Sequence, residues 1–194
     1  MRLWTKHGHF SKAFDKVWHE GLIFKLNQNG IKGNLLKTLK YFLSNRKQRV
    51  VLNGTESPWE TILAGVPQGS VLGLLFFQIY INDLTDNISS NMKLFADSSL
   101  FIKVTNIDLA QENLTDDLNK ITEWASRWKM RSNPDMTKQA IEIILSSKYK
   151  KGEHPPLVFN NIPVAREEST KHLGIILDHK LNFRKHKIDT VDKV

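Results

Sequence analysis

An apolar stripe between about Leu109 and Lys129 is the feature that most constrains the fold. Its members recur at steps of four, three, four and three residues, the spacing that places side chains on one face of an α-helix. They are Leu114, Leu118, Ile121, Ala125 and Trp128. From Asp108 to Glu123 the remaining positions are rich in acidic residues, and Lys120 is the only cation. The segment predicts a long amphipathic helix whose acidic side faces solvent, away from any polyanion.

Turn residues between short apolar runs predict two antiparallel hairpins. The first turns at Asn53-Gly54, the strongest short-range hairpin signal. The second is expected to turn tightly at Asp97-Ser98. The four expected strands are 48–52 with 58–63, and 92–96 with 99–104.

Shorter patterns in the sequence predict the remaining helices and strands. Apolar residues at helical spacing predict helices over residues 16–29, 34–43 and 71–84. Short apolar runs predict strands over 139–145, 157–159 and 172–177. This order lacks a strand–helix–strand alternation, so it predicts an α+β fold with antiparallel strands.

The composition is that of a globular chain: 194 residues, 40% hydrophobic, 28 Lys and Arg against 20 Asp and Glu, and no Cys. The absence of Cys excludes a disulfide scaffold, a Cys-based zinc site and a cysteine nucleophile. No apolar run is long enough to span a bilayer and the N-terminus has no signal-peptide core, so we expect no membrane partner. The net charge of +8 favours a polyanionic partner.

The positive charge is concentrated in one stretch. Between Glu20 and Glu56 there is no acidic residue, while Tyr41 and Phe42 lie among basic residues. A basic stripe with interleaved aromatic residues suits a nucleic-acid backbone. A solvated helix face whose aromatic residues point inward explains the pattern equally well. We assign four residues to a nucleic-acid stripe: Lys37, Lys40, Arg46 and Arg49.

Six segments follow one another in an order that carries a family resemblance. They are Phe10–His19 (FSKAFDKVWH), Ala64–Gly73 (AGVPQGSVLG), Tyr80–Leu84 (YINDL), Leu94–Ser98 (LFADS), Asn133–Lys138 (NPDMTK) and His172–Ile175 (HLGI). Together they resemble the reverse transcriptase of non-LTR retrotransposons, most like the jockey-type elements of animals. The resemblance runs over about residues 9 to 183.

The resemblance implies a fold, an activity and partners. The fold would be a polymerase palm, an antiparallel sheet with helices packed on one face. The activity would be RNA-templated DNA synthesis, a nucleotidyl transfer in which two Mg²⁺ ions clamp the attacking and leaving oxygens. The partners would be an RNA template and a DNA primer, or an RNA–DNA hybrid, together with deoxynucleoside triphosphates.

Two departures from the family pattern fall on the metal-binding carboxylates. The family has DFSKAFD where this chain has His9 before FSKAFD, and FADD where this chain ends in Ser98, which leaves Asp97 as the one retained carboxylate. Imidazole and hydroxyl groups are poor replacements, because Mg²⁺ prefers charged oxygen ligands. Asp15 lies six residues beyond His9, which is too far along the chain to take its place. We therefore expect weakened metal binding and an inactive copy.

The resemblance places other roles on residues that match the family better. Phe14 would lie under the sugar of the incoming nucleotide, and Gln68 and Gly69 would contact that nucleotide and the template. Leu173 and Gly174 would belong to the hairpin that grips the primer. The alternatives are a core aromatic residue at Phe14 and a plain strand turn at Gly174.

The resemblance also predicts how the chain divides. Residues 1–183 would form a partial reverse transcriptase domain, comprising the palm and the start of the thumb connection, and residues 184–194 a charged tail. The fingers and thumb would be largely missing, and residues 4–8 lack the apolar strand that the family has before His9. Two other hypotheses remain: a non-catalytic module that binds RNA or an RNA–DNA hybrid, and an unselected pseudogene product.

Overall fold

The computed structural model describes residues 2–6, 14–95, 97–102, 107–130, 140–145, 157–159, 162–172 and 174–191. The chain forms two compact units. The sheet unit comprises residues 1–11, 85–123 and 131–194, and the helical unit comprises residues 12–84 and 124–130. Both helices and small sheets are present, which confirms the mixed α+β class. No helix within the described ranges is long and apolar enough to cross a membrane.

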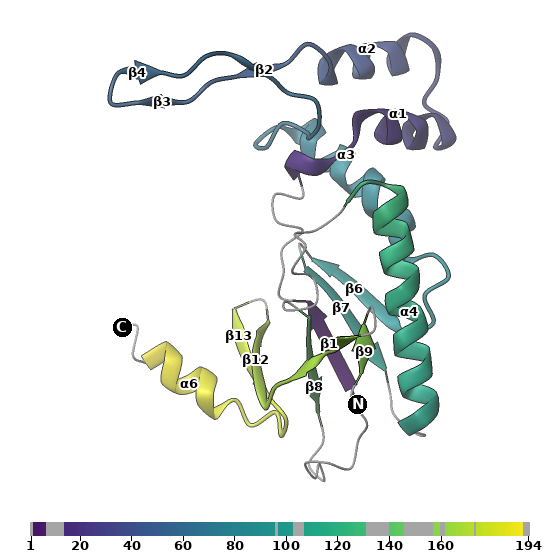
Figure 1. Ribbon diagram of the computed structural model, residues 1–194, viewed down its shortest axis with the longest axis vertical. Helices are drawn as coiled ribbons and strands as arrows, with labels where there is room; N and C mark the ends of the chain where they lie inside the picture. Colours follow the sequence, from purple (N-terminus) through teal and green to yellow (C-terminus); the bar gives the residue numbers. More distant parts are fainter. Residues whose placement is uncertain are drawn as a thin grey trace. The chain divides into compact units, whose positions relative to one another are not determined.

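The sheet unit is organised around a five-stranded sheet (Figure 1), in the order β11-β8-β1-β7-β6. Its strands are β1 (Arg2–Lys6), β6 (Asn91–Phe95), β7 (Asp97–Ile102), β8 (Ala140–Ile144) and β11 (Ala165–Arg166). All neighbouring strands pair antiparallel except β11 with β8, which are parallel. The predicted strand over 139–145 is confirmed as β8.

The central strand β1 is the main correction to the sequence analysis. The expectation that no strand precedes His9 is wrong, because Arg2–Lys6 pairs with β7 on one side and β8 on the other. Trp4 and Thr5 are residue types that favour strands. The strand is stabilised by backbone hydrogen bonds to β7 and β8 on either side. The sequence of residues 2–6 alone does not show that these two partners exist.

The second predicted hairpin also differs in its turn. Strands β6 and β7 pair from Asn91↔Phe101 to Phe95↔Asp97. Asp97 and Ser98 are therefore the first residues of β7 rather than the turn between the strands. The reason is that the ladder extends two residues further than the local pattern of turn residues indicates.

The long amphipathic helix is confirmed as α4 (Ile107–Arg127). Leu114 and Leu118 on its stripe are fully buried. The expectation that its acidic side faces solvent is wrong at Asp117, which is also fully buried. The Asp117 carboxylate accepts hydrogen bonds of 2.8 Å from the backbone N–H groups of Ser89 and Ser90, just before β6. These donors satisfy the buried charge and tie α4 to the edge of the sheet.

Two small hairpins and a helix complete the sheet unit. One hairpin pairs β9 (Val158–Phe159) with β10 (Ile162–Pro163), and the other pairs β12 (Ser169–His172) with β13 (Ile175–Asp178). The predicted single strand over 172–177 is thus split between β12 and β13. The predicted charged tail contains α6 (Arg184–Val191), and none of the described residues of this helix is buried.

Asp178 holds the end of β13 to the segment before α6. Its carboxylate accepts backbone hydrogen bonds from Lys180, Asn182 and Phe183 at 2.9 to 3.2 Å. Burial acts to raise the pKa of Asp178, but the donors at Asn182, Phe183 and Lys180 outweigh it and lower this pKa below its ordinary value. The charged carboxylate is therefore the form that stabilises this junction.

The helical unit contains short helices around an apolar core. They are η1 (Phe14–Lys16), α1 (His19–Gln28), α2 (Gly33–Leu43) and α3 (Val71–Ile81), and α3 continues into η2 (Asn82–Thr85). The three helices predicted for this part of the chain are confirmed. Its most deeply buried apolar residues are Val17, Leu22, Leu26, Leu43, Val66, Phe76, Tyr80, Leu84 and Met130.

A buried lysine lies at the centre of this helical core. Lys25 donates to the Tyr80 carbonyl oxygen and to the Asp83 carboxylate, both at 2.5 Å. Its Nζ also lies 4.8 Å from the ring centroid of Trp124 and 3.8 Å from that of Trp128. We call Lys25, Tyr80, Asp83, Trp124 and Trp128 the lysine cage. Burial raises the pKa of Tyr80 to about 12, with the Asp83 charge adding to the rise and a hydrogen bond from Trp18 opposing it.

A two-stranded ribbon extends from the helices of the same unit (Figure 1). We call residues 47–61 the arm. It pairs β2 (Lys47–Gln48) with β5 (Glu60–Thr61) and β3 (Val51–Leu52) with β4 (Thr55–Glu56). The predicted turn at Asn53-Gly54 is confirmed, since both residues have positive φ angles, 49° and 79°, as a type I′ turn requires. Every residue of the arm is exposed.

Candidate nucleotide-binding loop and nucleic-acid surface

The loop from Gly65 to Ser70 is held against η1 by backbone hydrogen bonds. The Gly65 N–H donates to the Val17 carbonyl at 2.8 Å, and the Val66 N–H donates to the Phe14 carbonyl at 2.7 Å. Gly65 has a φ of +90°, and a Cβ at this position would lie 2.7 Å from the Asp15 Cα. Only glycine allows this close approach of two backbones. Phe14 and Asp15, far from the loop in the sequence, are therefore brought next to it.

Two side chains converge on the carbonyl oxygen of Gly65. The His19 Nε2 donates to it at 2.7 Å, and the Arg46 Nη1 donates to it at 3.4 Å. His19 begins α1, and Arg46 immediately precedes the arm. The loop is thus fixed from both sides, by backbone donors and by side-chain donors.

The side chain of Gln68 reaches back to η1. Its Nε2 donates to the Asp15 Oδ1 at 3.2 Å, and both residues are exposed. The next residue, Gly69, has a φ of +83° and no atom within 4 Å of the position of a Cβ. Open space at an exposed backbone turn leaves room for a ligand to approach the main chain. Gln68 retains its amide oxygen as an acceptor for such a ligand.

The loop ends in a capped helix. The Ser70 Oγ accepts a hydrogen bond from the Gly73 N–H at 2.9 Å, which is an N-cap for α3. The same hydroxyl donates to the Pro67 carbonyl at 2.9 Å. A Cβ on Gly73 would lie 2.0 Å from that carbonyl oxygen. Pro67, Ser70 and Gly73 therefore fix the direction in which α3 leaves the loop.

Phe14 packs against α3 and keeps part of its surface exposed. Its ring stacks on Phe77 of α3, with centroids 4.5 Å apart and planes inclined by 25°. This contact matches the alternative of a core aromatic residue. Phe14 is nonetheless only half-buried, so part of its surface remains open beside the loop.

The end of β1, which precedes the first motif, and the start of β7, which contains Asp97 and Ser98, lie at one end of the sheet. Because β1 and β7 are antiparallel and Thr5 pairs with Ser99, the end of β1 lies beside the start of β7. Asp97 and Ser98 occupy that start. His9 follows β1 by three residues and lies outside the described residues, as do the side chains of Asp97 and Ser98. Among the side chains that are described, no group of three His, Asp or Glu could hold a metal ion.

The proposed primer-grip turn is only partly described. Leu173 lies outside the described residues. Gly174 is exposed, has a φ of +84° and separates β12 from β13. The turn itself is therefore present, and the alternative of a plain strand turn describes its geometry equally well.

The four residues of the predicted nucleic-acid stripe fall into two pairs. Lys37 and Lys40 are exposed on α2, three residues apart and so on neighbouring positions of one helix face. Lys40 also lines a cavity of about 460 Å³ with Trp18 and His19. Arg46 is engaged with the Gly65 carbonyl and Arg49 with the Glu56 carboxylate.

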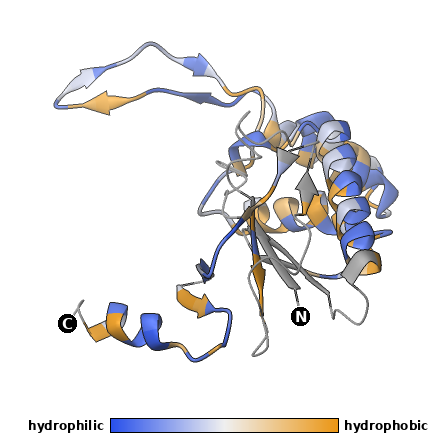
Figure 2. Ribbon diagram, turned by 60° about the horizontal axis from the view of Figure 1, so that its bottom comes forward, coloured by the Kyte–Doolittle hydropathy of each residue, from blue (hydrophilic) through white to orange (hydrophobic). Residues whose placement is uncertain are grey.

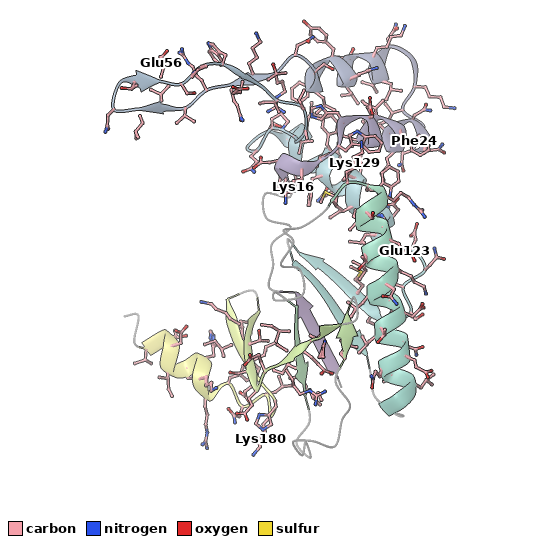
Figure 3. The ribbon with its side chains drawn as sticks, in the orientation of Figure 1. Lys16, Phe24, Glu56, Glu123, Lys129 and Lys180 are labelled. Carbon is pink, nitrogen blue, oxygen red and sulfur yellow. The ribbon has the colours of Figure 1, made fainter. Side chains whose placement is uncertain are left out.

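Sequence reasoning did not single out Trp59. The Arg49 Cζ lies 4.6 Å from the centroid of the Trp59 ring, and Trp59 is 57% exposed. Figure 3 labels Glu56, the carboxylate partner of Arg49, on the arm. A tryptophan across a predicted hairpin turn from an arginine is the signal that could have found this site.

Comparisons with known proteins agree with the motif order. Residues 9–177 match the family model described as reverse transcriptase (RNA-dependent DNA polymerase). The chain is 31% identical over 184 residues to the probable RNA-directed DNA polymerase from transposon X-element of Drosophila melanogaster, covering 92% of this chain and 20% of that protein. It is 30% identical over 184 residues to the RNA-directed DNA polymerase from mobile element jockey of the same species, covering 90% and 19%. The chain thus spans about a fifth of the length of these relatives.

Proposed function

The chain belongs to the reverse transcriptase family as a domain of the non-LTR retrotransposon type, and we propose that it holds nucleic acid without joining nucleotides. In this proposal its five-stranded sheet is the palm of the polymerase. The RNA template, the DNA primer and the nucleotide would be its ligands, and the two-metal chemistry of synthesis would be lost. The chain would then act as a non-catalytic module that binds RNA or an RNA–DNA hybrid.

The observation that carries the proposal is the pattern of departures inside the match. The family match covers residues 9–177 and includes both carboxylate motifs. Those motifs carry His9 and Ser98, while the loop motif around Gln68 is intact. The register of the sheet supports the assignment, since it places the end of β1 beside Asp97 at the start of β7.

The donor set does not fit a pair of Mg²⁺ ions. Mg²⁺ needs oxygen ligands and strict octahedral geometry, and an imidazole at His9 and a neutral hydroxyl at Ser98 supply neither charge nor a good match. Asp97 alone cannot balance two divalent ions. Asp15, the other nearby carboxylate in the sequence, is engaged with Gln68 at 3.2 Å. We therefore assign no catalytic step to this site.

The loop and η1 would still receive a nucleotide. Gly69 offers open main chain, Gln68 offers an amide oxygen, and Phe14 offers a half-buried ring for a sugar. The hydrogen bonds from Val66 and Gly65 hold these groups in place before a ligand arrives. A loop that is already ordered loses little conformational entropy on binding.

The basic surface would hold the nucleic acid. Lys37 and Lys40 are exposed on one face of α2, and no acidic residue occurs between Glu20 and Glu56. Lysines on an exposed helix face bind phosphates through charge, and such binding weakens as the salt concentration rises, because the release of condensed counterions then contributes less free energy. Replacing Lys37 and Lys40 with Gln should weaken RNA binding and make its salt dependence less steep.

The experiment that tests the proposal compares the natural chain with a restored one. The double variant His9→Asp, Ser98→Asp rebuilds the family's three carboxylates. Mn²⁺ binding would be followed by electron paramagnetic resonance, and incorporation of a labelled nucleotide would be followed on an RNA template with a DNA primer. Asp97→Ala in each background serves as the control.

We expect the natural chain to bind Mn²⁺ weakly and to incorporate nothing, and the double variant to bind Mn²⁺ tightly, in a manner that Asp97→Ala abolishes. Incorporation by the natural chain that is lost in Asp97→Ala would contradict the proposal. Equal Mn²⁺ binding by the natural chain and the double variant would contradict the role given to positions 9 and 98.

A further inference from the structure

The arm carries an aromatic surface that no core requires. Trp59 is 57% exposed, and Val51 and Leu52 in β3 are 57% and 69% exposed. Figure 2 shows β3 as a hydrophobic stretch within a largely polar ribbon. A large exposed indole on a two-stranded ribbon contributes little to folding, because no other layer covers it. Its exposure therefore points to a ligand.

The pairing of the strands places the basic and aromatic groups of the arm on one face. Lys47 pairs with Thr61, and Gln48 pairs with Glu60. Because alternate residues of a strand share a face, Lys47, Arg49 and Trp59 lie together and Glu60 lies on the opposite face. The distance of 4.6 Å between the Arg49 guanidinium carbon and the Trp59 ring centroid agrees with this arrangement.

Glu56 explains why the guanidinium lies on the ring. Its carboxylate forms an ion pair with the Arg49 guanidinium. Arg49 is thereby held from one side by a carboxylate and from the other by the indole. The indole holds the planar guanidinium where it can stack beside a base, while the Glu56 carboxylate competes with a phosphate for the N–H donors of Arg49.

The charge of the surrounding sequence selects the class of ligand. Seven basic residues and no acidic residue lie between Glu20 and Glu56, and two of the seven, Lys47 and Arg49, lie on this face. Tryptophan and arginine are also enriched at protein–protein interfaces, but lysine is depleted there, and cations beside an exposed aromatic ring are typical of surfaces that bind single-stranded nucleic acid. A single-stranded nucleic acid has phosphates for the two cations and unpaired bases for the Trp59 ring.

We propose that the face formed by Lys47, Arg49 and Trp59 binds an unpaired stretch of RNA, with one base stacked on Trp59 and its neighbouring phosphates on the two cations. This inference rests on the proposed function, since it assumes that RNA is a ligand. It adds a stacking site on the arm, separate from the loop at Gly65–Ser70 and from the lysines of α2.

The test measures binding of the full 194-residue chain to a fluorescently labelled uridine oligonucleotide by anisotropy, over a series of salt concentrations. Trp59→Leu should weaken binding about tenfold, the effect of losing one base–aromatic stack. Its salt dependence should match that of the natural chain, because every phosphate contact is kept. Trp59→Phe should retain most of the affinity.

Two further variants separate charge from stacking. Lys47→Gln should lower the slope of log affinity against log salt by about one, the effect of losing one phosphate contact. Arg49→Lys keeps the charge and loses the planar group, so it should weaken binding several-fold with the slope unchanged. Phe24→Leu is the matched control, because Phe24 is a similarly exposed aromatic residue, 55% exposed, on α1 rather than on the arm.

The outcomes distinguish a failure of the arm site from a failure of the proposed function. If the natural chain binds the oligonucleotide and Trp59→Leu and Arg49→Lys bind equally well, the arm site is wrong and the proposed function stands. If the natural chain does not bind at all, both are wrong. If sedimentation shows a dimer that Trp59→Leu dissociates while RNA affinity stays the same, the face binds a second copy and the inference is overturned.

Discussion

Among the cation–tryptophan pairs of the helical unit, the pair of Lys25 with Trp128 and the pair of Arg49 with Trp59 differ in what surrounds them. The Lys25 Nζ lies 3.8 Å from the Trp128 ring centroid, and Lys25 is only 5% exposed. The Arg49 Cζ lies 4.6 Å from the Trp59 ring centroid, and Trp59 is 57% exposed. The chemistry of attraction is the same in both pairs.

The surroundings decide what each pair does. In the lysine cage the ammonium also donates to the Tyr80 carbonyl and the Asp83 carboxylate. Those hydrogen bonds offset the cost of removing the charge from water. On the arm, more than half of the Trp59 surface remains open. A closed pair stabilises the fold, and an open pair is available to a ligand.

The largest expected effect comes from removing the buried cation. Lys25→Met should lower the free energy of unfolding by about 3 kcal/mol, because Asp83 loses its ion pair and the cage loses its hydrogen bonds. In a chain of this size that corresponds to a fall in Tm of about 9 °C. Thermal unfolding followed by circular dichroism measures it.

Lys37→Met is the matched control for this change, because Lys37 is exposed on α2. Its effect on the free energy of unfolding should stay within about 0.5 kcal/mol. Equal losses for Lys25→Met and Lys37→Met would show that the cage does not stabilise the helical unit.

The second prediction compares the contributions of Trp128 and Trp59 to the free energy of unfolding. Trp128→Leu should lower the free energy of unfolding by about 2 kcal/mol, since its ring packs on Tyr80 and on Lys25. Trp59→Leu should change it by less than about 0.5 kcal/mol, because every residue of the arm is exposed. Urea titrations of the two variants measure the difference. A larger loss for Trp59→Leu would reverse the comparison.

The third prediction concerns alkaline pH. Burial raises the pKa of Tyr80 from 10.0 to about 12 in the folded chain. The folded state therefore holds its phenol proton where the unfolded state has lost it. The stabilisation is complete below pH 10 and disappears as the pH rises towards 12.

Stability measured against pH in this window should fall less in Tyr80→Phe than in the natural chain. Of the 3 tyrosines of the sequence, Tyr80 should also be the last to show tyrosinate absorbance. A Tyr80 phenol that titrates at its ordinary pKa would contradict the burial of Tyr80 in the lysine cage.

The smallest effect is expected from Glu56→Gln on the arm. This change removes the carboxylate that pairs with Arg49, so the guanidinium becomes free to meet a phosphate. An exposed ion pair contributes about 0.2–1 kcal/mol, so stability should hardly change. RNA affinity at low salt should rise modestly, as anisotropy would show. A fall in affinity would mean that Glu56 is needed to hold Arg49 in its binding position.

The features that sequence reasoning found depend on neighbouring residues. The turn at Asn53-Gly54 follows from two residue types that tolerate positive φ. The stripe of α4 follows from a repeat within one helix, and Leu114 and Leu118 are buried as that repeat predicts. In both cases the information needed lies within one element.

The features that it missed depend on residues far apart in the chain. Strand β1 exists because β7 and β8 pair with it, and both come much later in the sequence. Asp117 is buried because the N–H groups of Ser89 and Ser90 reach its carboxylate. The pattern of one segment cannot show a partner that another segment supplies.

The candidate site shows the same division. Gln68 and Gly69 were found from a local motif, and the structure brings Gln68 to Asp15 in η1. Trp59 was missed because its significance depends on Arg49, across the turn of the arm. The roles of His9, Ser98, Leu173 and the metal remain predictions, since their side chains lie outside the described residues.

The central claim is that the exposed Trp59 contacts RNA, whereas Trp124 and Trp128 of the lysine cage do not. The most direct measurement is acrylamide quenching of tryptophan fluorescence in the natural chain and in Trp59→Phe, with and without a uridine oligonucleotide. The chain has 5 tryptophans, so the difference between the two proteins isolates Trp59. We predict that this difference signal is readily quenched in the free chain and protected by RNA. Protection of equal size in Trp59→Phe would contradict the claim.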